Sequence, residues 1–167
     1  MTRNILLLTL FCLCAYLSRA DQMSGHSDQI SDQTLGIHGG NGWELSWQKG
    51  NNHKRCEVNF GTLHHGLSIS LLKQFLYPLG TPSFRTYVGY GGQTIFDSDT
   101  HSVRLALGLA ANFGLEYSIR QIPLNISLDW RPVLAGKYTW IKDGADKFGI
   151  WNDGLVGFIG IGLRYRF

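Results

Sequence analysis

The sequence predicts an all-β fold: a closed antiparallel up-and-down transmembrane barrel of eight strands. Apolar residues recur at every second position along most of the chain, the chain ends in such a segment, and Gly is frequent (21 residues) while Pro is scarce (4 residues). A period of two places one set of side chains on each face of a strand. One set consists of Leu, Ile and aromatic residues, and the other is mainly Gly, Ala, Ser and Asn with isolated charges. The second set suits a narrow, enclosed interior.

The first 33 residues stand apart from this pattern. Residues 1–20 have the features of a secretory signal peptide: a positive start at Arg3, an apolar stretch and the small-x-small ending Ser18-Arg19-Ala20. The apolar stretch is too short to cross a bilayer as a helix. We expect cleavage near Ala20, which removes two arginines and takes the net charge from +3 to 3 − 2 = +1. Residues 21–33 are polar and are expected to form a periplasmic lead-in to a barrel domain at 34–167.

The first half of the barrel domain contains four alternating segments separated by residues typical of turns. The expected strands are 34–38, 43–48, 56–61 and 67–77, and the connections are 39–42, 50–52, 64–66 and 78–83. The first strand is the weakest, because only two of its positions alternate. The outward apolar residues are Leu35, Ile37, Trp43, Leu45, Trp47, Cys56, Val58, Phe60, Leu67, Ile69, Leu71, Phe75 and Tyr77.

The second half contains four further strands, and the sixth has the longest and most regular pattern. The expected strands are 84–91, 103–120, 124–131 and 158–167, and the connections are 97–101, 121–123 and 142–153. In the sixth, an apolar or Ala residue occupies every second position from Val103 to Ile119. Pro132 follows the seventh strand, and we expect the chain to leave the hydrocarbon there because Pro cannot donate a ladder hydrogen bond.

The composition of the two faces favours lipid over water as the solvent of the apolar face. Lys73 is the only formal charge on that face, and a charge at the bilayer midplane costs about 2–4 kcal/mol. Lys73 lies four residues before Tyr77, so its ammonium group can reach an interface. A membrane sheet cannot leave an edge unpaired, so it must close into a barrel. We therefore expect outer-membrane lipid as a partner and a monomer as the assembly state.

Short turns and long loops alternate in a way that orients the barrel. In bacterial single-chain barrels, the chain ends and the short turns lie in the periplasm. Counting back from the C-terminus places 50–52, 78–83 and 121–123 on that side, and 97–101 and 142–153 outside. An even strand number requires the weak first strand, which gives eight. The expected location is the outer membrane of a Gram-negative bacterium.

The inward face carries a nearly balanced set of charges. Eight strands enclose a space that side chains fill, and buried ions must be paired. We therefore predict a cross-linked polar core and weigh it against a narrow pore, which we consider the weaker alternative. The predicted interior network consists of Glu44, Glu57, Arg85, Arg104, Glu116, Asp129, Arg131, Arg164 and Arg166.

The C-terminal segment Gly160-x-Gly162-x-x-Tyr165-x-Phe167 resembles the signal by which outer-membrane barrels are recognised by their assembly machinery. The resemblance implies that this machinery is a partner, bound through Gly162, Tyr165 and Phe167. Gly160 departs from the pattern, which prefers a polar residue there. The chain from about residue 35 to its end is similar in plan to small eight-stranded barrels of the OmpA/OmpX type. It is more similar to short uncharacterised outer-membrane barrels that share Gly114-Leu115-Glu116-Tyr117, Ile122-Pro123-Leu124 and Ser127-Leu128-Asp129-Trp130-Arg131-Pro132. The resemblance implies fold and location but no activity.

Two functional classes are left open. The barrel has a structural role in the envelope, or it presents its outer loops to a surface ligand, for which 142–153 with Trp140, Ile150 and Trp151 is the best candidate. The alternative is a lipid-modifying enzyme of the deacylase type, which needs Ser, His and an acid. His64 and His65 lie near Ser68 and Ser70, but the alternation points both serines inward, away from lipid. We therefore expect no enzymatic activity.

Composition and motifs exclude several other classes. The near-neutral mature charge gives no electrostatic case for nucleic acid. Cys56 is the only cysteine beyond residue 20, so no internal disulfide framework is expected. Adjacent His64 and His65 diverge in an extended chain, and no metal-ligand spacing occurs. The glycines 157, 160 and 162 precede no helix that could receive a phosphate. We expect no cofactor and no metal.

Overall fold

A computed structural model of the protein describes residues 32–40, 42–63, 66–142, 144–151 and 159–167. The expected signal peptide, most of the expected lead-in, and His64 and His65 lie outside these residues. The described part forms ten antiparallel strand segments. They are β1 (Asp32–Gly39), β2 (Gly42–Gly50), β3 (Lys54–Leu63), β4 (Gly66–Leu79), β5 (Thr81–Ser98), β6 (Ser102–Ser118), β7 (Leu124–Trp130), β8 (Val133–Ile141), β9 (Lys147–Trp151) and β10 (Ile159–Arg166). Among the described residues, no helix is long and apolar enough to cross a membrane.

The ten segments make eight barrel strands, because two strands are each divided into two segments. β7 and β8 pair with β6 in one continuous register, in which Phe113 lies opposite Trp130 and Ala110 opposite Val133. The Ala111 N–H donates to the Pro132 carbonyl at 3.0 Å, so the ladder continues across the break. On the other side of this strand, β10 pairs with β7 and β9 with β8. The prediction of an eight-stranded all-β antiparallel barrel is confirmed.

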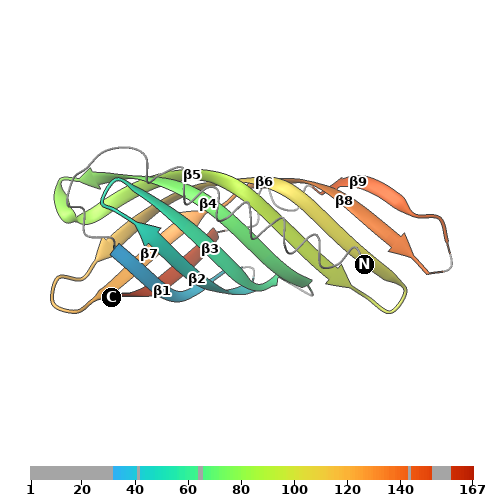
Figure 1. Ribbon diagram of the computed structural model, residues 1–167, viewed down its shortest axis with the longest axis horizontal. Coiled ribbons are helices and arrows are strands. Elements are labelled where there is room, and N and C mark those ends of the chain that lie inside the picture. Colours follow the sequence, from blue (N-terminus) through green and yellow to red (C-terminus); the bar gives the residue numbers. More distant parts are fainter. Residues whose placement is uncertain (1–31, 41, 64–65, 143, 152–158) are drawn as a thin grey trace. The chain divides into compact units, whose positions relative to one another are not determined.

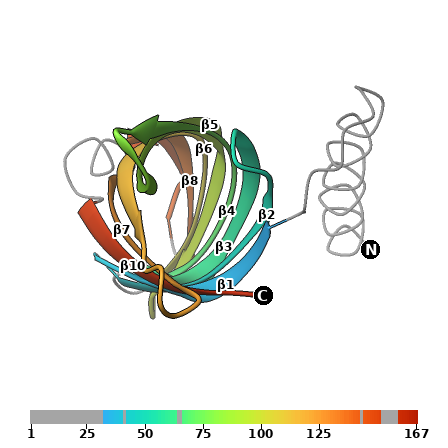
Figure 2. The same cartoon turned by 90° about the vertical axis from the view of Figure 1, so that its left-hand side faces the viewer.

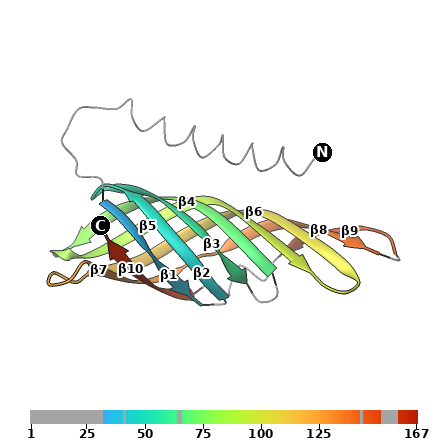
Figure 3. The same cartoon turned by 60° about the horizontal axis from the view of Figure 1, so that its bottom comes forward.

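Neighbouring strands pair in chain order, and β1 with β10 closes the barrel (Figure 2). Following cross-strand partners once round from Leu124 returns to the same strand at Leu134, a displacement of 134 − 124 = 10 residues. The path runs through Tyr165, Leu35, Trp47, Val58, Leu71, Gly92 and Leu109. A stagger of this size requires strands strongly tilted against the barrel axis, roughly 35–45°. Figure 3 shows this tilt.

The weak first strand is real and slightly longer than expected. β1 begins at Asp32, two residues before the expected boundary at Thr34, and pairs with β2 along its whole length. Its other edge pairs with β10 from Thr34 opposite Arg166 to Gly39 opposite Ile161. Without β1, the edges of β2 and β10 would both be open, so this strand is what closes the barrel.

Burial is inverted relative to a water-soluble protein. Most large apolar side chains point outward and are exposed, including Leu45, Leu109 and Leu128. The interior instead buries mainly polar and charged residues, together with a small apolar cluster. This cluster consists of Leu72, Ile95, Ala106, Ala110, Val133 and Ala135. The alternation predicted from the sequence is therefore observed, with the apolar set on the outside.

The strands differ greatly in length, so one side of the barrel extends past the other. β1 and β2 have 8 and 9 residues, whereas β5 and β6 have 18 and 17. β8 and β9, with the adjoining ends of β5 and β6, form a sheet extension at the end opposite the C-terminus (Figure 1). In the sheet order, β9 is a terminal strand with a partner on one side only among the described residues.

This region differs from the expectations in two ways. β7 ends before Pro132, as expected, but after residues 131 and 132 the pairing with β6 resumes at Val133 and the strand continues as β8. The segment 142–153 is not only a loop, because Lys147 to Trp151 pair with β8 as β9. Both differences have one cause: β6 is long enough to pair with β8 beyond the proline, and β8 in turn pairs with β9.

The pairing of β1 with β10 predicts which residues can be cross-linked. With Cys56 replaced by Ser, the pair Ile37→Cys and Leu163→Cys should form a disulfide under mild oxidation, since these positions are direct cross-strand partners. The product should migrate faster on a denaturing, non-reducing gel. The pair Leu35→Cys and Ile161→Cys is the control, because its positions lie four residues out of register. Equal cross-linking of both pairs would contradict the closure.

Candidate functional site

The barrel interior contains seven of the nine side chains predicted for a charge network. They are Glu44, Glu57, Arg85, Glu116, Asp129, Arg131 and Arg164, all at most 9% exposed. Arg55, which was not predicted, is also buried. Four carboxylates thus face four guanidinium groups in this part of the chain, with His38 as a fifth basic group.

Glu57 is the centre of the network's most completely bonded part. Its Oε1 accepts hydrogen bonds from Ser46 Oγ at 3.1 Å and from Arg164 Nη2 at 3.0 Å. Its Oε2 accepts from Gln48 Nε2 at 3.0 Å and from Gln74 Nε2 at 2.5 Å. All four partners come from different positions on β2, β4 and β10. The Glu57 carboxylate on β3 therefore bonds side chains of both neighbouring strands and of the more distant β10.

Arg164 has all of its guanidinium nitrogens in use. Besides Glu57, its Nε donates to Ser46 Oγ at 3.0 Å and its Nη1 to Ser127 Oγ at 2.6 Å. The side chain is fully buried. Such a cation is stable only with its partners in place, because a lone buried ion costs several kcal/mol.

A second ion cluster lies around Glu116. Its carboxylate pairs with Arg55 at 2.5 Å and with Arg85 at 3.1 Å. The Arg55 Nε also donates to Gln74 Oε1, which links this cluster to Glu57. The Arg55 guanidinium carbon lies 4.8 Å from the centre of the Tyr87 ring, within the range of a cation–π contact.

The third cluster joins His38, Asp129 and Glu44. His38 Nε2 lies 3.1 Å from one Asp129 oxygen, and the Tyr87 hydroxyl donates to the other at 2.7 Å. His38 Nδ1 lies 3.6 Å from Glu44, which also pairs with Arg131 at 2.8 Å. The imidazole is therefore held between two carboxylates.

Two interior glycines make room for the largest members of these clusters. A Cβ built at Gly160 would overlap the His38 ring, and one at Gly114 would overlap the Tyr87 ring. This explains the departure at Gly160 from the expected C-terminal pattern: any side chain there would displace His38 from Asp129.

Arg104 and Arg166 do not join the network, and the prediction is wrong for these two residues. Arg104 lies on the part of β6 that extends past the shorter strands, so its side chain is 43% exposed and pairs with Asp97 at 3.1 Å. Arg166 ends β10 at the opposite end of the barrel and is half-buried. Both have the inward parity but lie outside the enclosed section.

Sequence reasoning missed His38, Arg55 and Tyr87 for different reasons. His38 lies in the expected strand 34–38, but only Asp, Glu and Arg residues were counted as charged members of the network. Arg55 lies one residue before the expected strand 56–61, so extending the alternation by one residue would have found it. Tyr87 has the inward parity in the expected strand 84–91, but as an aromatic residue it was not counted as a polar partner. Its role depends on Asp129, which lies 42 positions away.

The serines considered for a deacylase belong to the interior. Ser68 Oγ donates to Glu44, and Ser70 Oγ accepts from Asn59 at 3.1 Å. His64 and His65, the bases considered with them, lie outside the described residues. In the described ranges, no group of three or more His, Cys, Asp or Glu side chains is arranged to hold a metal ion. The observed geometry is that of a cross-linked core.

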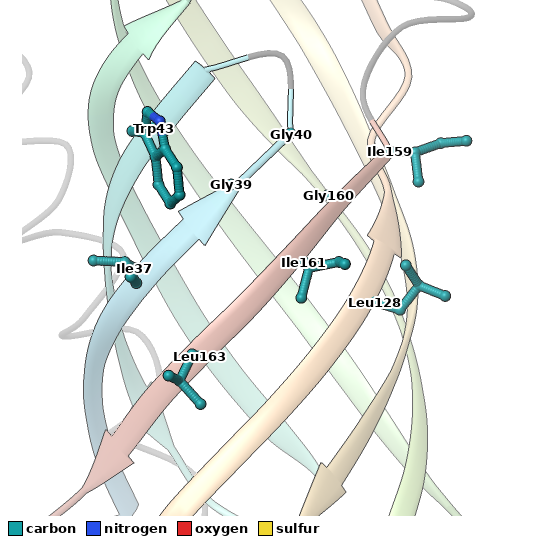
Figure 4. A pocket seen from close by; sticks show the side chains of 9 residues that line it. All are labelled: Ile37, Gly39, Gly40, Trp43, Leu128, Ile159, Gly160, Ile161 and Leu163. Carbon is teal, nitrogen blue, oxygen red and sulfur yellow. The ribbon is translucent and has the colours of Figure 1, made fainter.

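The outer surface has a shallow apolar groove where β1, β10 and β7 meet (Figure 4). Gly39, Gly40 and Gly160 lie along it without side chains, and Trp43 borders it. The other lining residues are Ile37, Leu128, Ile159, Ile161 and Leu163. None of these lining residues carries a charged side chain, so the groove suits an apolar occupant.

The sheet extension offers a second candidate surface. Phe148 and Ile150 on β9 are 77% and 67% exposed, and Tyr138 and Trp140 on β8 form an edge-to-face pair with centroids 4.7 Å apart. The Tyr138 hydroxyl bonds Asp146 at 2.9 Å, which ties the hairpin together. In the neighbouring β5–β6 turn, a hydrogen bond from the Thr100 backbone N–H lowers the pKa of Asp99. Within the described ranges, exposed apolar side chains and a strand edge without a partner thus occur together here.

Comparison of the chain with known protein families, with curated proteins and with solved structures gave no match.

The central position of Glu57 predicts a large effect of a small change. Glu57→Gln should lower the free energy of unfolding by about 3–5 kcal/mol, because it leaves the buried Arg164 without its counter-charge. Asp97→Asn removes one partner of an exposed ion pair and should cost about 1 kcal/mol or less. Urea unfolding of the refolded protein measures both. Similar losses in the two variants would contradict a core held together by ion pairs.

Proposed function

We propose that this protein is an integral outer-membrane barrel with a packed polar interior. The supporting observation is the inverted burial: a belt of exposed Leu, Ile and aromatic side chains surrounds a closed barrel whose inside is charged. Monomeric soluble proteins rarely expose apolar patches larger than a few hundred Å². Hydrocarbon is the surrounding in which such a belt is stable, and a closed barrel is one of two structures that satisfy the backbone there.

Lys73 is a charged residue on the outward face, and Lys49 and Lys54 share this face near the ends of β2 and β3. Lys73 lies opposite Cys56 on β3 and Tyr90 on β5, and its side chain is half-buried. A long aliphatic stem can remain in an apolar layer while the ammonium group extends toward the interface. Lysines that reach an interface in this way are compatible with a lipid-facing surface.

A packed interior is favoured over a narrow pore by the density of bonded side chains. The three clusters around Glu57, Glu116 and Asp129 connect strands that do not pair directly with each other. A conducting path would have to separate these ion pairs, at a cost of several kcal/mol for each. The interior therefore serves mainly to hold the barrel rigid.

The end of β10 supports assembly by the outer-membrane insertion machinery. Tyr165 and Phe167 point outward and are exposed, while Gly162 lies inside against Ser127 and Arg164. β10 is also one of the two strands of the closing seam. We infer that the machinery recognises this strand before β1 pairs with it.

The membrane assignment is tested by moving one charge. Leu128→Arg, in the middle of the belt, should destabilise the barrel in lipid vesicles by about 2–4 kcal/mol. Ile150→Arg, on the sheet extension, should cost little because that position lies in water. The folded fraction is measured at increasing urea concentration from the difference in gel mobility between unboiled and boiled samples. Equal stability of both variants, or a chain that stays in solution as a monomer without detergent, would overturn the assignment.

We further propose that the sheet extension is a surface for protein interaction. Among the described residues, β9 pairs on one side only, and the other edge of such a strand can pair with an extended segment of another protein. Exposed Phe148 and Ile150 supply apolar contacts beside that edge. A purely structural role would need neither feature.

The double variant Phe148→Asp, Ile150→Asp should fold normally and lose adhesion, because the charges oppose apolar contact without touching the interior. Attachment of cells that carry the chain, compared with cells lacking it, is the measurement. Lys142→Asp is the control, since it changes the charge of the neighbouring loop and removes the hydrogen bond from Lys142 Nζ to the Thr100 carbonyl, but leaves the side chains of β9 unchanged. Undiminished attachment of the double variant, or no attachment by the parent chain, would favour the structural role.

A further inference from the structure

In the middle of the barrel, several buried polar side chains have nitrogen or oxygen atoms that make no hydrogen bond. The unpaired atoms are Asn59 Oδ1, both amide atoms of Gln93, both amide atoms of Asn112, and Nε and Nη2 of Arg131. Each of these residues is at most 3% exposed. Buried polar groups are normally satisfied by protein, water or ligand. We call these four residues the mid-barrel cluster.

The members of the mid-barrel cluster are neighbours. Ser70 lies opposite Asn59 on one side and Gln93 on the other. Arg131 Nη1 lies 3.4 Å from Ser70 Oγ. The register that pairs Phe113 with Trp130 also places Asn112 opposite Arg131. Five consecutive strands thus direct these groups toward one part of the lumen.

Each of the two amides has a glycine as one of its two cross-strand neighbours. Gln93 lies opposite Gly108, and Asn112 lies opposite Gly89. Neither glycine has a side chain that could accept or donate a hydrogen bond, and the amide atoms make no hydrogen bond to their other neighbours, Ser70 and Arg131. The lumen is the remaining place from which a partner can reach these amides.

The unpaired atoms favour an acceptor-rich partner. The nitrogens of Gln93, Asn112 and Arg131 carry seven N–H bonds by their chemistry, whereas only three oxygens are unpaired. Arg131 uses Nη1 for Glu44, so Nε and Nη2 remain. These two N–H groups form the fork that matches a carboxylate with two parallel hydrogen bonds.

The charge of the interior limits the partner to a single negative charge. Four carboxylates balance four guanidinium groups among the described interior residues, and Glu44 lies close to Arg131. His38 faces Glu44 and Asp129 and is the one further basic group. A dianion would exceed what these groups can neutralise.

An apolar layer adjoins the mid-barrel cluster toward the sheet extension. Ile95 follows Gln93 by two residues, Ala110 precedes Asn112 by two, and Val133 follows Arg131 by two. Positions two apart share a face of the strand, and all three of these residues are buried. A ligand held by the mid-barrel cluster therefore has apolar side chains next to its other end.

We propose that the mid-barrel cluster is a binding site for a short-chain monocarboxylate. The carboxylate lies on the Nε–Nη2 fork of Arg131, with the amides of Gln93 and Asn112 as further donors. The alkyl part lies against Ile95, Ala110 and Val133. This site is independent of the lipid assignment, because it depends on the interior alone.

Acetate and butyrate, titrated at constant ionic strength against the full chain folded in detergent micelles, test the proposal. The side-chain N–H signals of Arg131, Gln93 and Asn112 should shift and saturate. Butyrate should bind more tightly than acetate, by about fourfold for each methylene that becomes buried. Acetamide, which has the same shape without the charge, should bind at least about tenfold more weakly than acetate.

Variants separate a binding site from a merely hydrated core. Gln93→Leu and Arg131→Lys should each weaken acetate binding about tenfold or more. Asn125→Leu is the matched control: it is buried on the same face of β7 but lies six residues from Arg131, so binding should be unchanged. If Arg131→Lys fails to fold, Gln93→Leu decides alone, since Gln93 has no side-chain partner to lose. The absence of a saturable shift, equal binding of acetamide, or equal binding of acetate and butyrate would overturn the proposal.

Discussion

The enclosed charges of the barrel must neutralise one another within a space too narrow for bulk water, and the other features follow from this constraint. Glu57 and Arg164 are both fully buried and lie 3.0 Å apart, although 107 positions separate them in the chain. Each would be unstable alone. The register of the strands that carry them is therefore specified from inside as well as by the alternation of the outer face.

Interior volume is the second constraint, and glycines leave the space that large interior side chains occupy. Gly160 and Gly114 lie where the rings of His38 and Tyr87 need space, and both rings bond the same aspartate, Asp129. Small and large side chains thus alternate around the lumen, as a small barrel requires. The mid-barrel cluster is the place where this complementarity is incomplete. Its unpaired atoms are the reason to expect a ligand there.

The unequal strand lengths give the two ends of the barrel different properties. At the end that carries the C-terminus, short turns join neighbouring strands. At the other end, β6 continues past its shorter neighbours and supports β8 and β9 beyond the proline at position 132. That extension has no opposite wall of equal length, so its edge and its aromatic side chains are accessible. A rigid base and an accessible sheet edge are the two requirements of a binding surface.

The alternation of apolar and small or polar residues predicts the class of fold, the strand number and the face that each side chain occupies, because a period of two is a local property of the chain. It also identified Glu44, Glu57, Glu116, Asp129, Arg85, Arg131 and Arg164 as interior residues. The three-dimensional arrangement of the strands determines which charged side chains form ion pairs, because partners such as Arg55 and Glu116 meet across the lumen through the ten-residue stagger of the barrel. It also decided that Arg104 lies outside the enclosed section and that β9 exists, since both depend on how far each strand extends relative to its neighbours.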